Sequence, residues 1–267
     1  MKVVFLDAYN LIYRALSGFT KGENFVIYNF FRGIRPLVAK FKPDLVYFVL
    51  EGNPKHRQTI SEGNYKSNRV SKGESFHLQK ASIIQAVKTF MPFICIRHPD
   101  FECDDVIATL TRNHSKKGDE CFIISSDSDF IQLHNLCELT LYNPVKKKNI
   151  PKPDYDYVTW KALRGDPTDN IHGIPRVGDK TAEKLVKDEN LLIEFLKDPN
   201  KKDIFNRNVN LIRLVDLSNV EDEMEISSTK FDEEGLRKYF ERLKFDSMIK
   251  EKTWNNYIET FKEVGNE

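Results

Sequence analysis

The first half of the chain alternates short apolar runs with amphipathic stretches. Five runs have the length and composition of buried strands: residues 3–6, 45–50, 93–96, 121–125 and 139–142. Between them, apolar residues recur at helical spacing in four stretches: residues 24–41, 75–90, 104–115 and a short one after Asp129. Apolar strands that alternate with helices are typical of a parallel sheet covered on both faces. We therefore predict an α/β fold with a mostly parallel central sheet flanked by helices.

The texture changes at NPVKKKNIPKP, residues 143–153, which is basic and interrupted by proline. Such a stretch indicates a loop or a domain boundary. We therefore predict one domain over residues 1–150 and a helical region over 151–267. Helices are expected there at 154–163, at 181–187 and onward to about residue 261, and loops at the charged, Asn-rich stretches 198–210 and 219–230.

Acidic residues follow the predicted strands. Asp7 ends the first apolar run, and Glu51 follows the second. Glu102 comes after the third run, and Asp127 and Asp129 come after the fourth. Parallel strands end at one edge of a sheet, where ligands bind in open α/β folds. We therefore expect these side chains to line a carboxylate-rich cleft.

Each pair of neighbouring acids also has a simple structural explanation. In FECDDVIATL, Asp104 and Asp105 begin a predicted helix, where acids complement the helix dipole. Glu102 and Asp105 are spaced to share one face of that helix. SSDSDFIQL has the composition of a turn, and RGDPTDNIHGIP places Asp166 and Asp169 in a turn that contains proline.

The joint placement of the acids outweighs these separate explanations. Two carboxylates about 5 Å apart repel by roughly 3 kcal/mol at an effective dielectric of about 20, so converging acids need protons or cations. Oxygen ligands without His or Cys suit Mg²⁺ or Mn²⁺ rather than zinc. Two such ions can stabilise the attacking and leaving oxygens of a phosphoryl displacement. We therefore predict phosphodiester hydrolysis, with nine candidate metal ligands: Asp7, Glu51, Glu102, Asp104, Asp105, Asp127, Asp129, Asp166 and Asp169.

Basic and glycine-rich segments lie between the acidic ones. NYKSNR carries Lys66 and Arg69, with more basic residues at 55–57, and forms either a solvated loop or a site for the scissile phosphate. HGIPRVGDKTAEKL is either a tight turn between helices or a helix start that binds phosphate through backbone N–H groups. It differs from a P-loop because Gly and Lys are not adjacent and no strand precedes it. Its candidate phosphate-binding residues are Gly173, Gly178, Lys180 and Thr181.

The composition argues against a membrane-spanning or secreted protein but does not identify the function. The chain has 267 residues, with 41 Lys and Arg, 40 Asp and Glu, and a net charge of +1, although a balanced total can hide segregated charge. No apolar run approaches the roughly 20 residues of a membrane helix, and the start lacks the features of a secretory signal. The four cysteines form no CxxC pair, which is expected of reduced thiols. We expect a cytoplasmic protein without a membrane partner.

Together the motifs resemble the structure-specific 5′-nuclease (flap endonuclease) family, which includes the N-terminal nuclease domain of bacterial DNA polymerase I and bacteriophage 5′-exonucleases. LDAYNLIYRA resembles the family's VDG…L.YRA, and NYKSNR resembles its YK..R element. FECDDVIATL is similar to the EADD helix and SSDSDFIQL to T.DKD..QL. GDPTDNIHGIPRVGDKTAEKL is similar to GD..DN.PGVPGIG.KTA. These motifs occur in the family's order from Asp7 to about Lys187.

The resemblance implies a PIN-like fold with a short arch at about 55–80 and a helix-three-turn-helix at about 166–187. It implies that Asp7, Glu102, Asp104, Asp127 and Asp129 ligate two Mg²⁺ or Mn²⁺ ions. Asp105, Asp166 and Asp169 would ligate directly or through water.

The resemblance also implies which basic groups meet DNA. Lys66 would contact the scissile phosphate, with Arg69 beside it at the base of the arch, and Arg14 would be a further DNA contact. Asp7 and Asp127 would be catalytic together with Lys66 and Arg69. The 173–181 turn would grip the duplex backbone and hold a K⁺ ion.

This chain departs from the family pattern at three places. Glu51 stands where the family has Asp, and Ala8 stands where it has Gly. The segment between Arg69 and Glu102 is short, and Arg69 lacks the proline that follows it in the family. These departures concern one metal ligand and the order of the arch.

We therefore expect a monomeric, Mg²⁺-dependent 5′-3′ exonuclease and flap endonuclease that acts on duplex DNA with a 5′ flap, nick or 5′ end in replication or repair. One alternative is a 5′-exonuclease that removes RNA primers from RNA–DNA hybrids. Another is a non-catalytic DNA-binding relative, although every acidic motif is intact. A PIN-like ribonuclease for single strands is disfavoured because the predicted helix-three-turn-helix binds duplexes.

Overall fold

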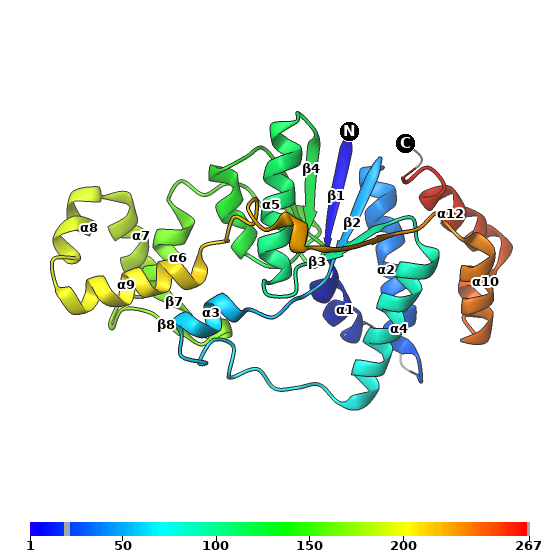
Figure 1. The fold of residues 1–267 in the computed structure, drawn as a ribbon, viewed down its shortest axis with the longest axis horizontal. Helices are drawn as coiled ribbons and strands as arrows, with labels where there is room; N and C mark the ends of the chain where they lie inside the picture. The colour runs from blue at the N-terminus through cyan, green and yellow to red at the C-terminus, as the bar shows by residue number, and fades with distance from the viewer. Residues whose placement is uncertain (19–21, 266–267) are drawn as a thin grey trace.

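A seven-stranded sheet forms the centre of the computed structural model, which describes residues 1–18 and 22–265. The strand order is β6-β5-β4-β1-β2-β3-β9 (Figure 1). The strands are β1 (Lys2–Asp7), β2 (Leu45–Val49), β3 (Ile94–Arg97), β4 (Glu120–Ile124), β5 (Thr140–Asn143), β6 (Lys148–Asn149) and β9 (Glu225–Ser228). Strands β1 to β5 pair in parallel, and β6 and β9 add antiparallel edges. The predicted mostly parallel sheet is confirmed.

Helices cover both faces of this sheet, as alternating residues of the strands require. Val4 and Leu6 face one core with helices α1, α2, α4, α10 and α12, whereas Val3 and Phe5 face the other with α5 and η1. These helices are α1 (Ala8–Leu16), α2 (Phe25–Phe41), α4 (Glu74–Phe90), α5 (Cys103–Lys116), η1 (Asp129–Asn135), α10 (Glu233–Arg242), α11 (Asp246–Ile249) and α12 (Glu251–Phe261). The helices predicted from periodicity correspond to α2, α4 and α5.

A helical region lies beside the sheet, on the side of α5 away from α2 (Figure 1). It consists of α6 (Tyr157–Arg164), β7 (Gly165–Asp166), η2 (Pro167–Asp169), β8 (Ile171–His172), α7 (Asp179–Lys187), α8 (Glu189–Phe195) and α9 (Pro199–Ile212). Two small cores of its own stabilise it, and one of them includes Tyr65 from the segment after α3 (Lys55–Ile60). This packing ties the segment that carries Lys66 to the helical region.

Two glycines allow close backbone contact between α6 and the turn after β8. A Cβ on Gly173 would lie 2.0 Å from the carbonyl oxygen of Arg164, and one on Gly165 would lie 2.3 Å from the backbone nitrogen of Gly173. Gly165 also has a φ of 83°, which disfavours other residues. Gly173 is therefore required for packing, whatever else it does.

The expected loop at residues 198–210 is wrong, because this stretch forms α9. Asp198 caps the helix by accepting hydrogen bonds from the backbone N–H groups of Asn200 and Lys201, and Pro199 occupies the first turn. An Asp–Pro start is a recognised helix signal. The polar composition reflects a helix that contributes few residues, such as Leu211 and Ile212, to the core.

The C-terminal residues of the predicted 151–267 region return to the sheet. Within the expected loop 219–230, η3 (Glu221–Glu223) leads into β9, which pairs with β3. Helices α10 and α12 then pack into the same core as α2 and α4. Every side chain of β9 is exposed, so the strand lacks the apolar pattern that would predict it.

Residues 55–80, where an arch is expected, contain α3, a series of turns, an extended stretch and the start of α4. No helix closes over the acidic edge within this segment. Across the parts of the chain that the structure describes, none of the helices has the length and apolar character needed to cross a membrane.

Candidate metal centre at the carboxyl edge of the sheet

Asp7 lies at the end of β1, where the chain turns into α1. Its carboxylate caps α1 by accepting a hydrogen bond from the Asn10 N–H at 3.0 Å, and it accepts another from the Ser125 hydroxyl at 2.7 Å. Glu51 and Asp127 follow β2 and β4, the two strands that flank β1. The parallel arrangement therefore brings the three acids to one edge, as predicted.

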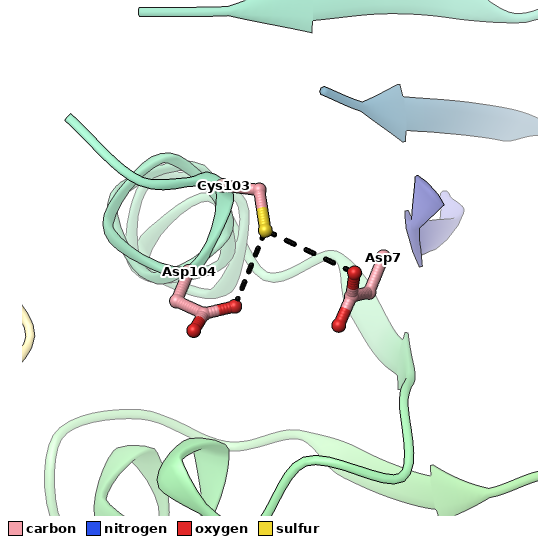
Figure 2. A group of neighbouring side chains, drawn as sticks. All are labelled: Asp7, Cys103 and Asp104. Carbon is pink, nitrogen blue, oxygen red and sulfur yellow. Dashed lines mark hydrogen bonds between the residues drawn. The ribbon is translucent and has the colours of Figure 1, made fainter. Parts of the chain in front are cut away.

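Helix α5 begins at the same edge and contributes Asp104 and Cys103. The Cys103 Sγ lies 3.8 Å from Asp7 Oδ1 and 3.4 Å from Asp104 Oδ1. Figure 2 shows the sulfur between the two carboxylates. Their ligand atoms all lie within 4.8 Å of one another. An all-oxygen ligand set is expected from the sequence, whereas the structure places a thiol within it.

Four carboxylates of this cluster have no cationic partner, and we call Asp7, Glu51, Asp104 and Asp127 the cation-free group. Within residues 1–18 and 22–265, no lysine or arginine forms an ion pair with any of them, although the neighbouring acids are paired. Burial raises the pKa of Asp7 to about 7, and the charges of Asp127 and Glu51 add to this increase. Burial and neighbouring carboxylates also raise the pKa of Glu51 and Asp104 and outweigh the charge of Lys66, which lowers both. A further cation would therefore favour the ionised forms of these carboxyls.

A second cluster contains Asp129, Asp166 and Asp169, whose ligand atoms lie within 4.8 Å of one another. We call it the cation-paired group, because Lys161 binds Asp129 and lies 2.6 Å from Asp166, and Arg69 lies 2.6 Å from Asp169. Burial disfavours the ionised form of Asp166, but Lys161 outweighs it and lowers the pKa of that carboxyl. Burial raises the pKa of Asp129 to about 7 against the effect of Lys161. A protein cation already occupies this cluster.

Lys161 is the residue of this site that sequence reasoning missed. It lies on α6, and only 5% of it is exposed. Lys161 stands among the apolar residues of that helix, which is the one sequence signal that it is buried. Because a buried lysine requires an acidic partner, this position could have predicted an ion pair. It also lines a cleft of about 490 Å³ next to the cation-paired group, together with Trp160 and Arg164.

Glu102 and Asp105 share one face of α5, as their spacing predicts, and Arg57 lies between them. The Arg57 guanidinium donates to both oxygens of Asp105 at 2.5 and 2.8 Å, and its Nη1 lies 3.0 Å from Glu102 Oε2. Asp105 also accepts from the Val215 N–H at 2.8 Å and has no exposed surface. These contacts anchor α3 and the segment after α9 to α5, and the role of Asp105 as a metal ligand stays a prediction.

The turn that carries Lys66 is fixed against Glu102 and Asp169. The Tyr65 hydroxyl lies 2.9 Å from Glu102 Oε2 and 3.1 Å from Asp169 Oδ2, and the Lys66 N–H donates to the Asp169 carbonyl at 3.0 Å. The Lys66 ammonium binds Glu102. Burial disfavours this ammonium, but Glu102 and Asp169 outweigh it and raise the pKa of Lys66. Glu102 is thus neutralised by protein cations.

The predicted phosphate-binding residues lie apart from these clusters. Gly178 precedes α7 without a side-chain cap, and Lys180 and Thr181 are exposed in the first turn. Their N–H groups and the lysine are therefore available to an anion. Arg14 is half-buried in the last turn of α1, and its predicted contact with DNA stays a prediction.

Sequence comparison identifies the family. The model for the 5′-3′ exonuclease, N-terminal resolvase-like domain, matches residues 2–161, so the chain belongs to this family, and the resemblance seen in its motifs is confirmed. A thermostable DNA polymerase I of Thermus caldophilus is 31% identical over 94% of this chain and 33% of the relative. A 5′-3′ exonuclease of Aquifex aeolicus is 28% identical over 94% of this chain and 95% of the relative. The chain spans about a third of the length of the polymerases.

Solved structures support the fold. The T5 D15 protein, co-crystallised with metal ions, aligns with a TM-score of 0.66 and 16% identity over 97% of this chain and 99% of the other. The catalytic core of Rad2, solved with a DNA substrate, aligns with a TM-score of 0.55 and 17% identity over 97% and 92% of the two chains. These similarities establish the PIN-like α/β fold that the motifs imply.

Proposed function

We propose that this chain is a metal-dependent, structure-specific 5′ nuclease that hydrolyses phosphodiester bonds near 5′ ends or flap junctions of duplex DNA. The observation that carries the proposal is the cation-free group. Asp7 is buried and the other three carboxylates are half-buried, and none has an ion-pair partner among residues 1–18 and 22–265. Such carboxylates at the carboxyl edge of a parallel sheet are suited to divalent ions. The family of the chain and the T5 D15 protein, which was co-crystallised with metal ions, also support a divalent metal site.

The residues present fit a divalent metal. Asp7, Asp104, Asp127 and Glu51 would hold an ion, with Mg²⁺ or Mn²⁺ as the proposed metal. When bound, it would supply a Lewis acid and an acidified water for attack on phosphorus. A second ion would bind Asp129, Asp166 and Asp169 in exchange for the ammonium of Lys161.

Protein cations would position the phosphate. Lys66 binds Glu102 in the structure and lies 3.7 Å from Asp169, so a phosphate entering the site would draw its ammonium from Glu102. Arg69 is half exposed beside it. We propose that both neutralise charge at the scissile phosphate, and that Arg14 contacts the DNA backbone nearby.

The start of α7 would hold the duplex away from the cut. Gly178, Lys180 and Thr181 present N–H groups and a positive charge without any means to read bases. We propose that this turn binds the phosphate backbone irrespective of sequence and that carbonyls within 173–181 hold a K⁺ ion. Binding should weaken steeply with salt.

The test is cleavage of a 5′-flap duplex labelled at both ends, with Mg²⁺, with Mn²⁺ and with EDTA. Asp127→Ala should lower the rate by about 100-fold or more, because it removes a ligand of the cation-free group. Asp203→Ala is the matched control, because Asp203 is an exposed acid on α9. Binding without cleavage in either metal would contradict the proposal and favour a non-catalytic DNA-binding relative.

The same assay separates the remaining alternatives. Matched substrates with a DNA or an RNA 5′ strand compare flap cleavage with removal of RNA primers. A single strand alone tests ribonuclease activity of the PIN-like type. We expect cleavage of the DNA flap near the junction and little cleavage of the isolated strand.

A further inference from the structure

Cys103 has a buried thiol inside the cation-free group. Only 4% of the residue is exposed, and Sγ points between Asp7 and Asp104 (Figure 2). The backbone N–H of Cys103 also faces Glu51 Oε2 at 3.4 Å. The sulfur therefore lies among three carboxylates, none of which forms an ion pair with a lysine or arginine of residues 1–18 and 22–265.

The distances suit shared coordination of one ion. Zinc lies about 2.3 Å from a cysteine sulfur and about 2.1 Å from a carboxylate oxygen, so its ligand atoms are up to roughly 4 Å apart. The Cys103 sulfur lies 3.8 Å from Asp7 Oδ1 and 3.4 Å from Asp104 Oδ1. All three ligand atoms lie within 4.8 Å of one another, so small side-chain movements would bring them onto one ion.

Cys103 differs from the other buried cysteines in its polar contacts rather than in its burial. Cys95, Cys103 and Cys121 are all buried among apolar side chains of the two cores. The Cys103 sulfur also contacts the carboxylates of Asp7 and Asp104. Cys103 alone among the four cysteines lies in a group of metal-ligating atoms of the described chain.

We infer that Cys103 is a ligand for thiophilic divalent ions, so that zinc, cobalt or cadmium binds Cys103, Asp7 and Asp104 and displaces Mg²⁺ from this site. The inference rests on the metal site of the proposed function and adds which metal ions that site prefers. Thiolate favours soft and borderline ions, whereas Mg²⁺ retains oxygen ligands and water. The thiol proton passes to solvent as the metal–sulfur bond forms.

The test is a cobalt titration of the metal-free, full-length protein followed by absorption. A thiolate-to-cobalt charge-transfer band in the near ultraviolet should appear with one equivalent of Co²⁺. Cys103→Ala and Cys103→Ser should both abolish the band, and the serine variant guards against loss of packing. Cys137→Ala is the matched control and should retain it, because Cys137 lies outside the acidic edge.

Calorimetry with Zn²⁺ gives a second readout. The affinity for Zn²⁺ should fall by at least about tenfold in Cys103→Ala, the low end of the loss seen on changes around metal ligands. Absence of the cobalt band in the wild type, or its persistence in both variants, would overturn the inference. Cleavage of the flap by the wild type in Mg²⁺ alone is scored separately, so failure of the proposed function is distinguishable from failure of this ligand assignment.

Discussion

Two groups of acids share the carboxyl edge of the sheet, and they differ in how their charge is balanced. In the cation-paired group, Lys161 and Arg69 contact the carboxylates. In the cation-free group, the nearest partners are a hydroxyl, backbone N–H groups and a thiol. Burial is similar in the two, so the difference lies in the partners.

The protein thus neutralises one of the two groups with its own cations and leaves the other without one. Lys161 keeps Asp166 ionised and lowers its pKa, whereas the pKa of Asp104 is raised because burial and further carboxylates surround it. The two carboxyl groups therefore differ in what their ionised forms require. Asp166 already has Lys161 as a partner, whereas Asp104 has no ion-pair partner among the described residues. The cation-free group is where an external cation would stabilise the fold most.

The largest expected effect comes from Lys161→Met, which removes the cation from the paired group. Loss of one partner of a buried ion pair costs about 3–5 kcal/mol of unfolding free energy. Denaturant unfolding of the metal-free protein measures it. Lys187→Met, which breaks an exposed pair with Asp154, is the control and should leave the midpoint unchanged. A loss below about 1 kcal/mol in Lys161→Met would mean that Lys161 does not balance this group.

The second effect is a dependence of stability on pH in the metal-free protein. The pKa of Asp7 is raised from 3.8 to about 7. Between these two pH values the carboxyl is protonated in the folded state and ionised in the unfolded state. Stability therefore falls as pH rises through this window, and Asp129 acts in the same direction. At about 1.4 kcal/mol per pKa unit, the shift of Asp7 alone corresponds to a loss of about 4 kcal/mol between about pH 4 and pH 7.

Thermal unfolding at several pH values, with EDTA and with Mg²⁺, checks this slope. Divalent ions bind the ionised carboxylates, so Mg²⁺ should stabilise the protein more at high pH than at low pH. If the stability of the metal-free protein instead rose with pH over this window, Asp7 would have a cationic partner and this interpretation would be wrong.

The third prediction concerns Asp104→Asn, which removes one charge from the cation-free group. Cleavage should fall by about 100-fold, or about 2.7 kcal/mol of activation free energy, because a proposed metal ligand is lost. The metal-free variant should nevertheless unfold at a higher temperature than the wild type, since carboxylate repulsion is relieved. Asp166→Asn is the matched variant of the paired group and should be less stable, because Lys161 loses a partner. A drop in stability of both variants would remove the distinction between the groups.

The smallest effect is expected at the start of α7, whose Lys180 and Thr181 belong to neither group. Lys180→Ala should weaken binding of duplex DNA by about 1 kcal/mol and lower the salt slope by about one, without a change in sequence preference. Fluorescence anisotropy over a range of salt concentrations measures both. Lys197→Ala, on the exposed side of the helical region, serves as control. Equal affinity of Lys180→Ala and wild type would remove α7 from the DNA interface.

The sheet and most of the acidic edge are predictable because their signals are local. Strands β1 to β5 and helices α2, α4 and α5 follow from spacing within each segment. Asp7, Glu51 and Asp127 come to one edge because parallel strands must end there. Strand β9 and helix α9 were not predictable in this way, because exposed polar side chains carry no such pattern.

Periodicity along the chain thus determined the fold class and the edge at which the acids meet. Only the folded chain decided which acids are neutralised, because their partners come from distant segments: Arg57 lies 48 residues from Asp105, and Lys161 lies 32 residues from Asp129. The thiol of Cys103 joins Asp7 across 96 residues in the same way. Strand and helix patterns are set by neighbours in sequence, whereas the charge balance of a buried site is set by neighbours in space.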